Sequence, residues 1–212
     1  MPNIFETAHR VLKIVSATQS VYDLPININH VKHAVSKLCG GAELSYFFLD
    51  IDSAKVRGYF KKGYITKGVY STDSELVGQV FVSINQDEHW QNFVGVKEAL
   101  HLLDSETSTA GNQQSVAHLI QDLHTSIDLD GESARNIIRA ADRVALVGAV
   151  EVLFPYEARL AVREKYEADK LKDFELAKIA AIPDRFVRAA MTDRWFQASA
   201  EARKSCNLGE LN

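Results

Sequence analysis

Apolar and polar positions in the first half of the chain follow two different periods, and the change of period separates helices from strands. Apolar side chains first recur at helical spacing in two segments, which Leu24-Pro25 separates. They then alternate with polar residues at every second position, as in pleated strands. The expected elements are, in chain order, a helix over residues 4–19, a helix from a cap at Asn27 or Asn29 to Gly40-Gly41, and strands over residues 43–51, 55–60, 64–70 and 80–85. The two middle segments, on either side of Lys61-Lys62-Gly63, are expected to form separate strands or a hairpin.

From residue 90 onward, after a polar turn, the apolar positions keep helical spacing. Segment 132–153 is long and very apolar, so we expect a central buried helix there. The tail, residues 192–212, is expected to fade into polar residues after Trp195 and Phe196, which we interpret as packing residues, with a partner site as the alternative. The remaining expected helices span residues 112–124, 156–169, 172–180 and 184–191.

This order of elements predicts an α+β fold, with a small, mostly antiparallel sheet packed on helices and a C-terminal helical extension. We place the main domain at residues 1–170 and the extension with its tail at residues 171–212. A chain of 212 residues with 46% apolar and 25% charged residues is long and apolar enough to bury a core of ordinary size.

Charge and cysteine content narrow the classes of function. The net charge of −4 argues against nucleic acid as a bulk electrostatic partner, although it leaves room for a local basic face. The two cysteines, Cys39 and Cys206, lie far apart in the sequence and suggest reduced thiols in a cytoplasmic protein. The charged N-terminal stretch predicts no signal peptide, and no segment has the apolar length of a membrane span.

The helix around residue 97 combines a buried face with reactive side chains. Residues 97–101 (Lys-Glu-Ala-Leu-His) would form the His-Glu-x-x-His helix of zinc peptidases if residue 97 were histidine. A protonated lysine has no lone pair and repels a metal cation, so Lys97 cannot serve as a zinc ligand. The simpler interpretation is a surface Lys-Glu pair beside a histidine at the edge of the core. The apolar face of this helix consists of Phe93, Val96, Leu100 and Leu103.

Three stretches, taken in order, resemble the ImmA/IrrE family of metallopeptidases. They are LPININHVKHAVSKLCGGAELSYFFL, VFVSINQDEHWQNFVGVKEALHLLD and DRVALVGAVEVLFP, and FELAKIAAIPDRFVRAAM is similar to the helical pair that follows them in that family. The resemblance covers roughly residues 8–191. It implies a zincin-like core and a role that often involves phage or mobile-element repressors.

Residue by residue, the resemblance places Glu98 at the position of the general base and His101 at that of the second metal ligand. Asp142 falls at the position of the third, acidic ligand, where the family usually has glutamate with one more methylene. Lys97 departs from the pattern at the first ligand. We therefore expect a catalytically impaired protein that acts in binding or regulation through a protein or peptide partner. We expect no cofactor, with zinc on His101 and Asp142 as the alternative.

Two other functions remain open. One is an active metal-dependent peptidase with non-standard ligands, in which His89 could replace the missing ligand. The other is a DNA-associated regulator that uses residues 172–194, where Arg185, Arg188 and Arg194 could form a basic face. Helical spacing and solvation explain these arginines equally well. The other groups that we weighed have simpler interpretations: His118 and His124 as surface histidines, and residues 128–132 as a helix cap in preference to a calcium loop.

Overall fold

The structure, a computed structural model, describes the chain except for residues 1–3, 67–73, 105–135, 210 and 212 and the side chains of residues 136–143. The expected helix 112–124, both of its histidines and the segment 128–132 therefore lie outside the described residues. The described elements are, in chain order, α1 (Ile4–Val15), α2 (Ile28–Leu38), β1 (Glu43–Leu49), β2 (Gly58–Thr66), β3 (Ser74–Ser83), α3 (Glu88–Leu100), the 3₁₀ turn η1 (His101–Leu103), α5 (Asn136–Leu153), α6 (Tyr156–Glu167), α7 (Asp173–Ala180), α8 (Asp184–Ala190) and α9 (Asp193–Ser205).

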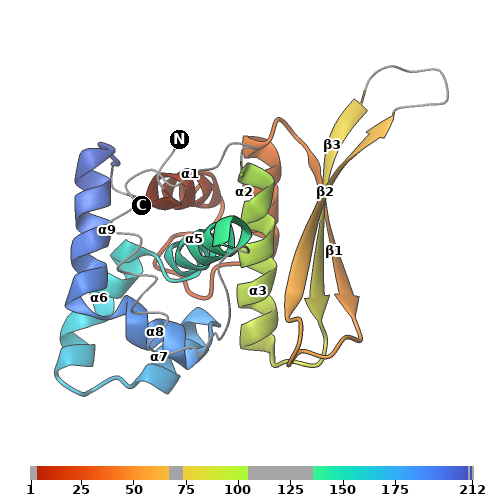
Figure 1. The fold of residues 1–212 in the computed structure, drawn as a ribbon. Coiled ribbons are helices and arrows are strands. Elements are labelled where there is room, and N and C mark those ends of the chain that lie inside the picture. Colours follow the sequence, from red (N-terminus) through yellow and green to blue (C-terminus); the bar gives the residue numbers. More distant parts are fainter. Residues whose placement is uncertain (1–3, 67–73, 105–135, 210, 212) are drawn as a thin grey trace.

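The described helices all lie on one side of the three-stranded sheet (Figure 1). α2 and α3 lie next to the sheet, α5 and α1 lie behind them, and α6 and α9 are furthest from the sheet. The predicted combination of helices with a small sheet is confirmed at this level. The packing follows from the amphipathic pattern, because each helix buries one apolar face against the next layer.

The sheet is mixed, so the prediction of a mostly antiparallel sheet is wrong. The strand order is β1-β3-β2, with β3 parallel to β1 and antiparallel to β2. Each strand runs in the direction opposite to the previous strand in the sequence, so β1 and β3 point the same way. Because β3 lies between β1 and β2, it pairs with β1 in parallel and with β2 in antiparallel orientation. The expected break at Lys61-Lys62-Gly63 is also absent: β2 continues through it, and Gly63 pairs with Val77.

The sheet face that points away from the helices carries a row of stacked aromatic rings. Phe47 and Tyr59 are both registered with Phe81 on the central strand. The ring centroids of Phe47 and Phe81 lie 5.1 Å apart, and those of Tyr59 and Phe81 lie 4.5 Å apart. Such cross-strand pairs stabilise a sheet and help to fix its register.

Helix α2 begins and ends as the sequence predicts. The Asn27 side chain accepts a hydrogen bond from the backbone N–H of Asn29, which caps the N-terminus. Gly40 and Gly41 follow the helix with φ of 70° and 88°, a conformation that other residues adopt only with strain. This pair of glycines turns the chain from α2 into β1.

The core forms where α3 meets α5. On the predicted apolar face around α3, Phe93, Val96 and Leu100 are buried and Leu103 is half-buried. In α5, which was expected to be a buried helix, Ala145 is buried and Val144 is half-buried, and the side chains of Ile138 and Ala141 are among those not described. In the described part of the chain, no helix has the length and apolar character that a membrane span requires.

The C-terminal tail is not a polar extension, because residues 193–205 form α9. Trp195 and Phe196 are buried in the core, which confirms their interpretation as packing residues. The signal missed in the sequence was Thr192, whose side chain caps this helix by accepting from the backbone N–H of Trp195. Helices α7 to α9 contribute to the same hydrophobic core as α1 and α3, and the boundary after residue 170 stays a prediction.

Helix α9 is also joined to α5 and α6 by a buried polar network. One carboxylate oxygen of Glu151 accepts hydrogen bonds from Arg159 (2.6 Å), Trp195 Nε1 (2.6 Å) and Ser199 Oγ (2.9 Å). Arg159 is completely buried and also donates to the backbone oxygen of Ala190 at 3.3 Å. A buried charge is tolerable only when it is paired in this way.

Candidate functional site

Helix α3 carries the candidate site at its C-terminal end. Asp87 caps the helix by accepting from the backbone N–H of Trp90 at 3.0 Å. The helix therefore begins at Glu88, and His89 lies in its first turn and not in the polar turn expected before it. The last turn of α3 contains Lys97 and Glu98, and His101 then opens the short η1 turn.

Lys97 and Glu98 form a nearly buried ion pair. Lys97 Nζ lies 2.7 Å from Glu98 Oε1, and their side chains are only 11% and 4% exposed. Neighbouring helical residues do not normally face each other, so the flexible lysine stem must fold back for this contact to form. Water screens such a pair poorly, so removal of either partner would be costly.

His101 extends this pair into a chain of polar groups. Its Nδ1 is in hydrogen-bonding contact with Asp104 Oδ2 at 2.7 Å, and its Nε2 lies 3.9 Å from Glu98 Oε2. A carboxylate on one imidazole nitrogen fixes the orientation of the ring and leaves the other nitrogen facing the site. The order of contacts is therefore Lys97, Glu98, His101 and Asp104. Asp104 was missed in the sequence, although it follows His101 at the helical spacing of three residues.

Strand β2 passes close over this part of α3 because residue 58 is glycine. A Cβ atom at Gly58 would lie 2.4 Å from Val94 Cγ1, 2.7 Å from the backbone oxygen of Phe81 and 3.6 Å from Glu98 Cγ. The glycine therefore allows the strand to cover the helix beside Glu98. The aromatic ring of Phe60, two residues later, lies 6.3 Å from the imidazole of His101.

We expect Gly58→Ala to lower the free energy of unfolding by about 1–3 kcal/mol, because the added methyl group overlaps both a side chain and a backbone oxygen. Denaturant titration measures this loss. Gly63→Ala is a matched control on the same strand, because its Cβ would make an ordinary contact of 3.7 Å with Val77 Cγ2. Equal stability changes in the two variants would contradict the close approach at Gly58.

The predicted convergence of Asp142 with Glu98 and His101 is outside the described side chains, although the backbone of residue 142 belongs to α5. Helix α5 does cross α3 near this site, because a Cβ at Gly148 would lie 2.9 Å from Leu100 Cδ1. Among the described residues, no group of three or more histidine, cysteine, aspartate or glutamate side chains is arranged to hold a metal ion. The ligand role of Asp142 stays a prediction.

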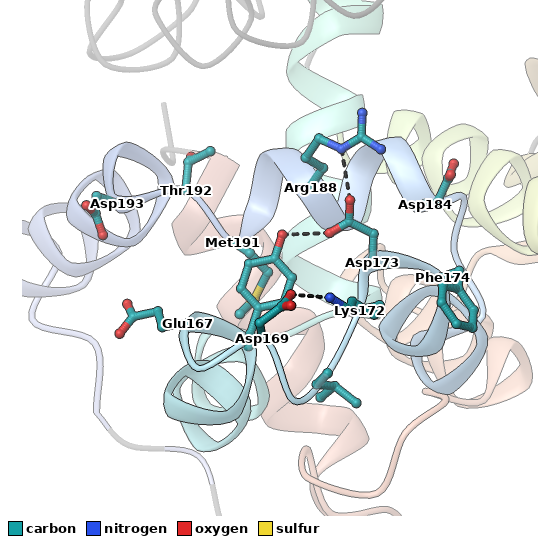
Figure 2. Close-up of a pocket in the computed structure, with 12 residues that line it drawn as sticks. Glu167, Asp169, Lys172, Asp173, Phe174, Asp184, Arg188, Met191, Thr192 and Asp193 are labelled. Carbon is teal, nitrogen blue, oxygen red and sulfur yellow. Dashed lines mark hydrogen bonds and ion pairs between the residues drawn. The ribbon is translucent and has the colours of Figure 1, made fainter.

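A second feature is an open hollow of about 1150 Å³ between α6, α7, α8 and the start of α9 (Figure 2). Asp173 lies within it and accepts from Tyr166 Oη at 2.6 Å and from Arg188 Nε at 2.9 Å. Burial alone would raise the pKa of Asp173, but these two hydrogen bonds lower it below its usual value. Burial and the same aspartate raise the pKa of Tyr166 to about 12. The acidic residues that line the hollow are Glu167, Asp169, Asp173, Asp184 and Asp193, against the bases Lys172 and Arg188.

The hollow bears on the possible DNA-binding face, because it includes part of α7 and α8. Arg188 pairs with Asp173, and Arg185 packs against the ring of Trp90 at 4.1 Å. Lys172 pairs with Asp169, as Figure 2 shows. In the lining of the hollow, carboxylates outnumber basic side chains, so the hollow itself does not favour a polyanion such as nucleic acid.

Comparison of the chain with protein-family models, with curated proteins and with solved structures finds no match. The function of the site therefore has to be inferred from its residues and their geometry.

Proposed function

We propose that this protein is a zincin-like relative of the ImmA/IrrE peptidases that uses the site at the end of α3 for binding or regulation and not for hydrolysis. The observation that supports the proposal best is the ion pair between Lys97 Nζ and Glu98 Oε1, 2.7 Å apart and almost buried. In this proposal, the lysine ammonium supplies the positive charge that a metal ion supplies in an active peptidase.

The chemistry of the pair explains why hydrolysis would fail. A zinc peptidase needs a glutamate that is free to polarise a metal-bound water. In this chain one oxygen of Glu98 is held by an ammonium group, which has no lone pair for a metal. Glu98 is thus a vestigial general base, and Lys97 is the residue that disrupts the motif.

The strand beside the site suggests the kind of partner. Among the described strands, β2 is at one edge of the sheet, since β3 lies between it and β1. Edge strands offer backbone N–H and C=O groups to an added strand, a common way for proteins to bind extended peptides. We therefore propose a protein or peptide partner that lies along β2. A role with phage or mobile-element repressors would agree with the resemblance in the sequence.

An active metal-dependent peptidase is the second candidate, and His101 is the observation that favours it. The contact between His101 Nδ1 and Asp104 is the kind of support that orients metal-binding histidines. In this alternative, a metal would displace Lys97 from Glu98 and recruit His101 together with a carboxylate such as Asp142.

Metal analysis separates the two candidates. The protein, purified without chelator, is expected to contain no stoichiometric zinc and to cleave no peptide. Lys97→His restores the His-Glu-x-x-His pattern and should tighten zinc binding by roughly tenfold or more, because it adds a neutral imidazole ligand and removes a repelling cation. Isothermal titration calorimetry with zinc measures this gain.

Lys97→Leu is the matched control, since it removes the ammonium without supplying a ligand. It should gain less zinc affinity than Lys97→His and should destabilise the fold, because Glu98 loses the cation at 2.7 Å. One zinc per chain in the unmodified protein, lost on His101→Ala, would overturn the proposal and favour the active peptidase.

A further inference from the structure

Two arginine side chains from distant parts of the sequence lie against one tryptophan ring. The guanidinium carbon of Arg57 lies 3.7 Å from the ring centroid of Trp90, and that of Arg185 lies 4.1 Å from it. Arg57 precedes β2, Trp90 is in the first turn of α3, and Arg185 is in the first turn of α8. The three side chains meet only because these elements pack together.

Each of the three residues is fixed by its own local structure. The backbone oxygen of Arg57 accepts from the backbone N–H of Ser83 and from Gln86 Nε2, both at 3.0 Å. The ring of Trp90 packs edge-on against Phe186, with centroids 5.6 Å apart. Because the ring is anchored to the core, it holds both guanidinium groups in place. Stacking reduces the conformational freedom that an arginine would lose on binding a ligand.

Within the described part of the chain, no carboxylate pairs with either of these two arginines. Neither guanidinium group donates a hydrogen bond or forms an ion pair with any residue in the described part of the chain. The contrast with other arginines is clear: Arg159, Arg163, Arg188 and Arg203 each contact a carboxylate. The nearest acid in sequence, Asp184, uses Oδ1 to accept the backbone N–H of Arg185 at 2.8 Å.

The surroundings of Arg185 make this lack of compensation costly. Its Nε is buried and has no acceptor, and a buried donor that is left unpaired costs free energy. Burial and the charge of Arg57 lower the pKa of Arg185 to about 10, although Asp184 acts in the opposite direction. A second cation beside a half-buried arginine destabilises the protein unless something else supplies negative charge.

We propose that Arg57, Trp90 and Arg185 form a binding site for an oxyanion, the phosphate or carboxylate group of a ligand. Stacking on the indole occupies one face of a guanidinium group, and its N–H groups at the edge stay available. These edges match the oxygen spacing of phosphate and carboxylate, which arginine binds with two parallel hydrogen bonds. An oxyanion bound there would supply negative charge beside the half-buried Arg185 and reduce the repulsion between the two cations.

This inference does not depend on the role of Lys97. Trp90 and Glu98 are eight residues apart on α3, so the oxyanion site lies about two helical turns from the candidate site. The oxyanion site would function in the same way in a binding protein and in a peptidase.

Titration of the full chain with inorganic phosphate at low ionic strength tests the proposal. Calorimetry should give saturable binding, and Arg57→Ala should weaken it by roughly ten- to a hundredfold, the effect of losing charge-assisted hydrogen bonds. Arg57 is exposed and precedes a strand, so its replacement should leave the fold intact. Arg185→Ala should weaken binding to a similar extent. Arg188→Ala is the matched control, because this arginine is on the same helix, is 68% exposed and already pairs with Asp173, and it should bind phosphate like the unmodified protein.

Tryptophan fluorescence gives an independent readout. The other tryptophan, Trp195, is fully buried and bonded to Glu151, so a change on addition of phosphate should come from Trp90 and disappear in Trp90→Phe. A parallel titration with acetate shows whether the site prefers phosphate or carboxylate. Binding of neither anion, or binding that Arg57→Ala and Arg185→Ala leave unchanged, would overturn the proposal.

Discussion

Replacing Glu151 with alanine is expected to lower the free energy of unfolding by about 3–5 kcal/mol, the usual cost of removing one partner of a buried ion pair. Arg159 would remain in the core with its main anionic partner gone, since it is fully buried and Glu151 Oε1 lies 2.6 Å from its guanidinium group. Trp195 Nε1 and Ser199 Oγ would lose the same acceptor. Chemical denaturation monitored by circular dichroism measures the loss.

Two further variants test whether charge or shape causes the effect. Glu151→Gln keeps an acceptor oxygen but removes the charge, so its loss should be intermediate. Replacing Glu151 and Arg159 together with apolar residues of similar volume should recover part of the stability, because no isolated charge then remains. Glu164→Ala, on the exposed surface of α6, should change stability by less than about 0.5 kcal/mol. A loss in Glu151→Ala as small as in this control would mean that the network contributes little.

Leu100→Ala should lower the free energy of unfolding by about 2–5 kcal/mol, as for other well-packed core leucines. Leu100 is only 2% exposed and lies where α5 crosses α3 at Gly148. Both helices are fixed at this crossing, so they cannot close fully around the cavity that the truncation leaves. Urea titration with a constant m-value would show that the loss belongs to the folded state.

Leu160→Ala on α6 is the control for leucine truncation in general, because Leu160 is 51% exposed. Its effect should stay within about 0.5 kcal/mol. If Leu100→Ala also cost less than about 0.5 kcal/mol, the placement of Leu100 at the centre of the core would be wrong.

The sequence by itself determined most of the helices. The apolar period predicted α1, α2, α3 and α5 to α8, and Asn27 with Gly40-Gly41 predicted the two ends of α2. These signals are local: a helix face repeats every three to four residues, and caps act within one turn. The same locality made residues 97–101 stand out as similar to the His-Glu-x-x-His pattern, with lysine in place of the first histidine.

The order of the strands was decided only in the tertiary structure. Alternation along a strand shows which side chains share a face, but it carries no information about which strand lies beside it. The central position of β3, and with it the parallel pairing to β1, depends on how the sheet packs on α2 and α3. Helix α9 was missed because, beyond Trp195 and Phe196, its buried face consists of the small residues Ala198, Ser199 and Ala202, a weak apolar signal.

Which side chains meet at the candidate site and around Trp90 also depended largely on the tertiary structure. The sequence identified Lys97, Glu98 and His101, which lie within one helical turn of one another. Asp104, three residues after His101, could have been found by the same local argument. The sequence could not identify Gly58 as the contact that brings β2 over the site, or the meeting of Arg57, Trp90 and Arg185. Contacts between residues close in sequence follow from helical geometry, whereas contacts between distant residues exist only after the apolar faces of the helices and the sheet have packed together.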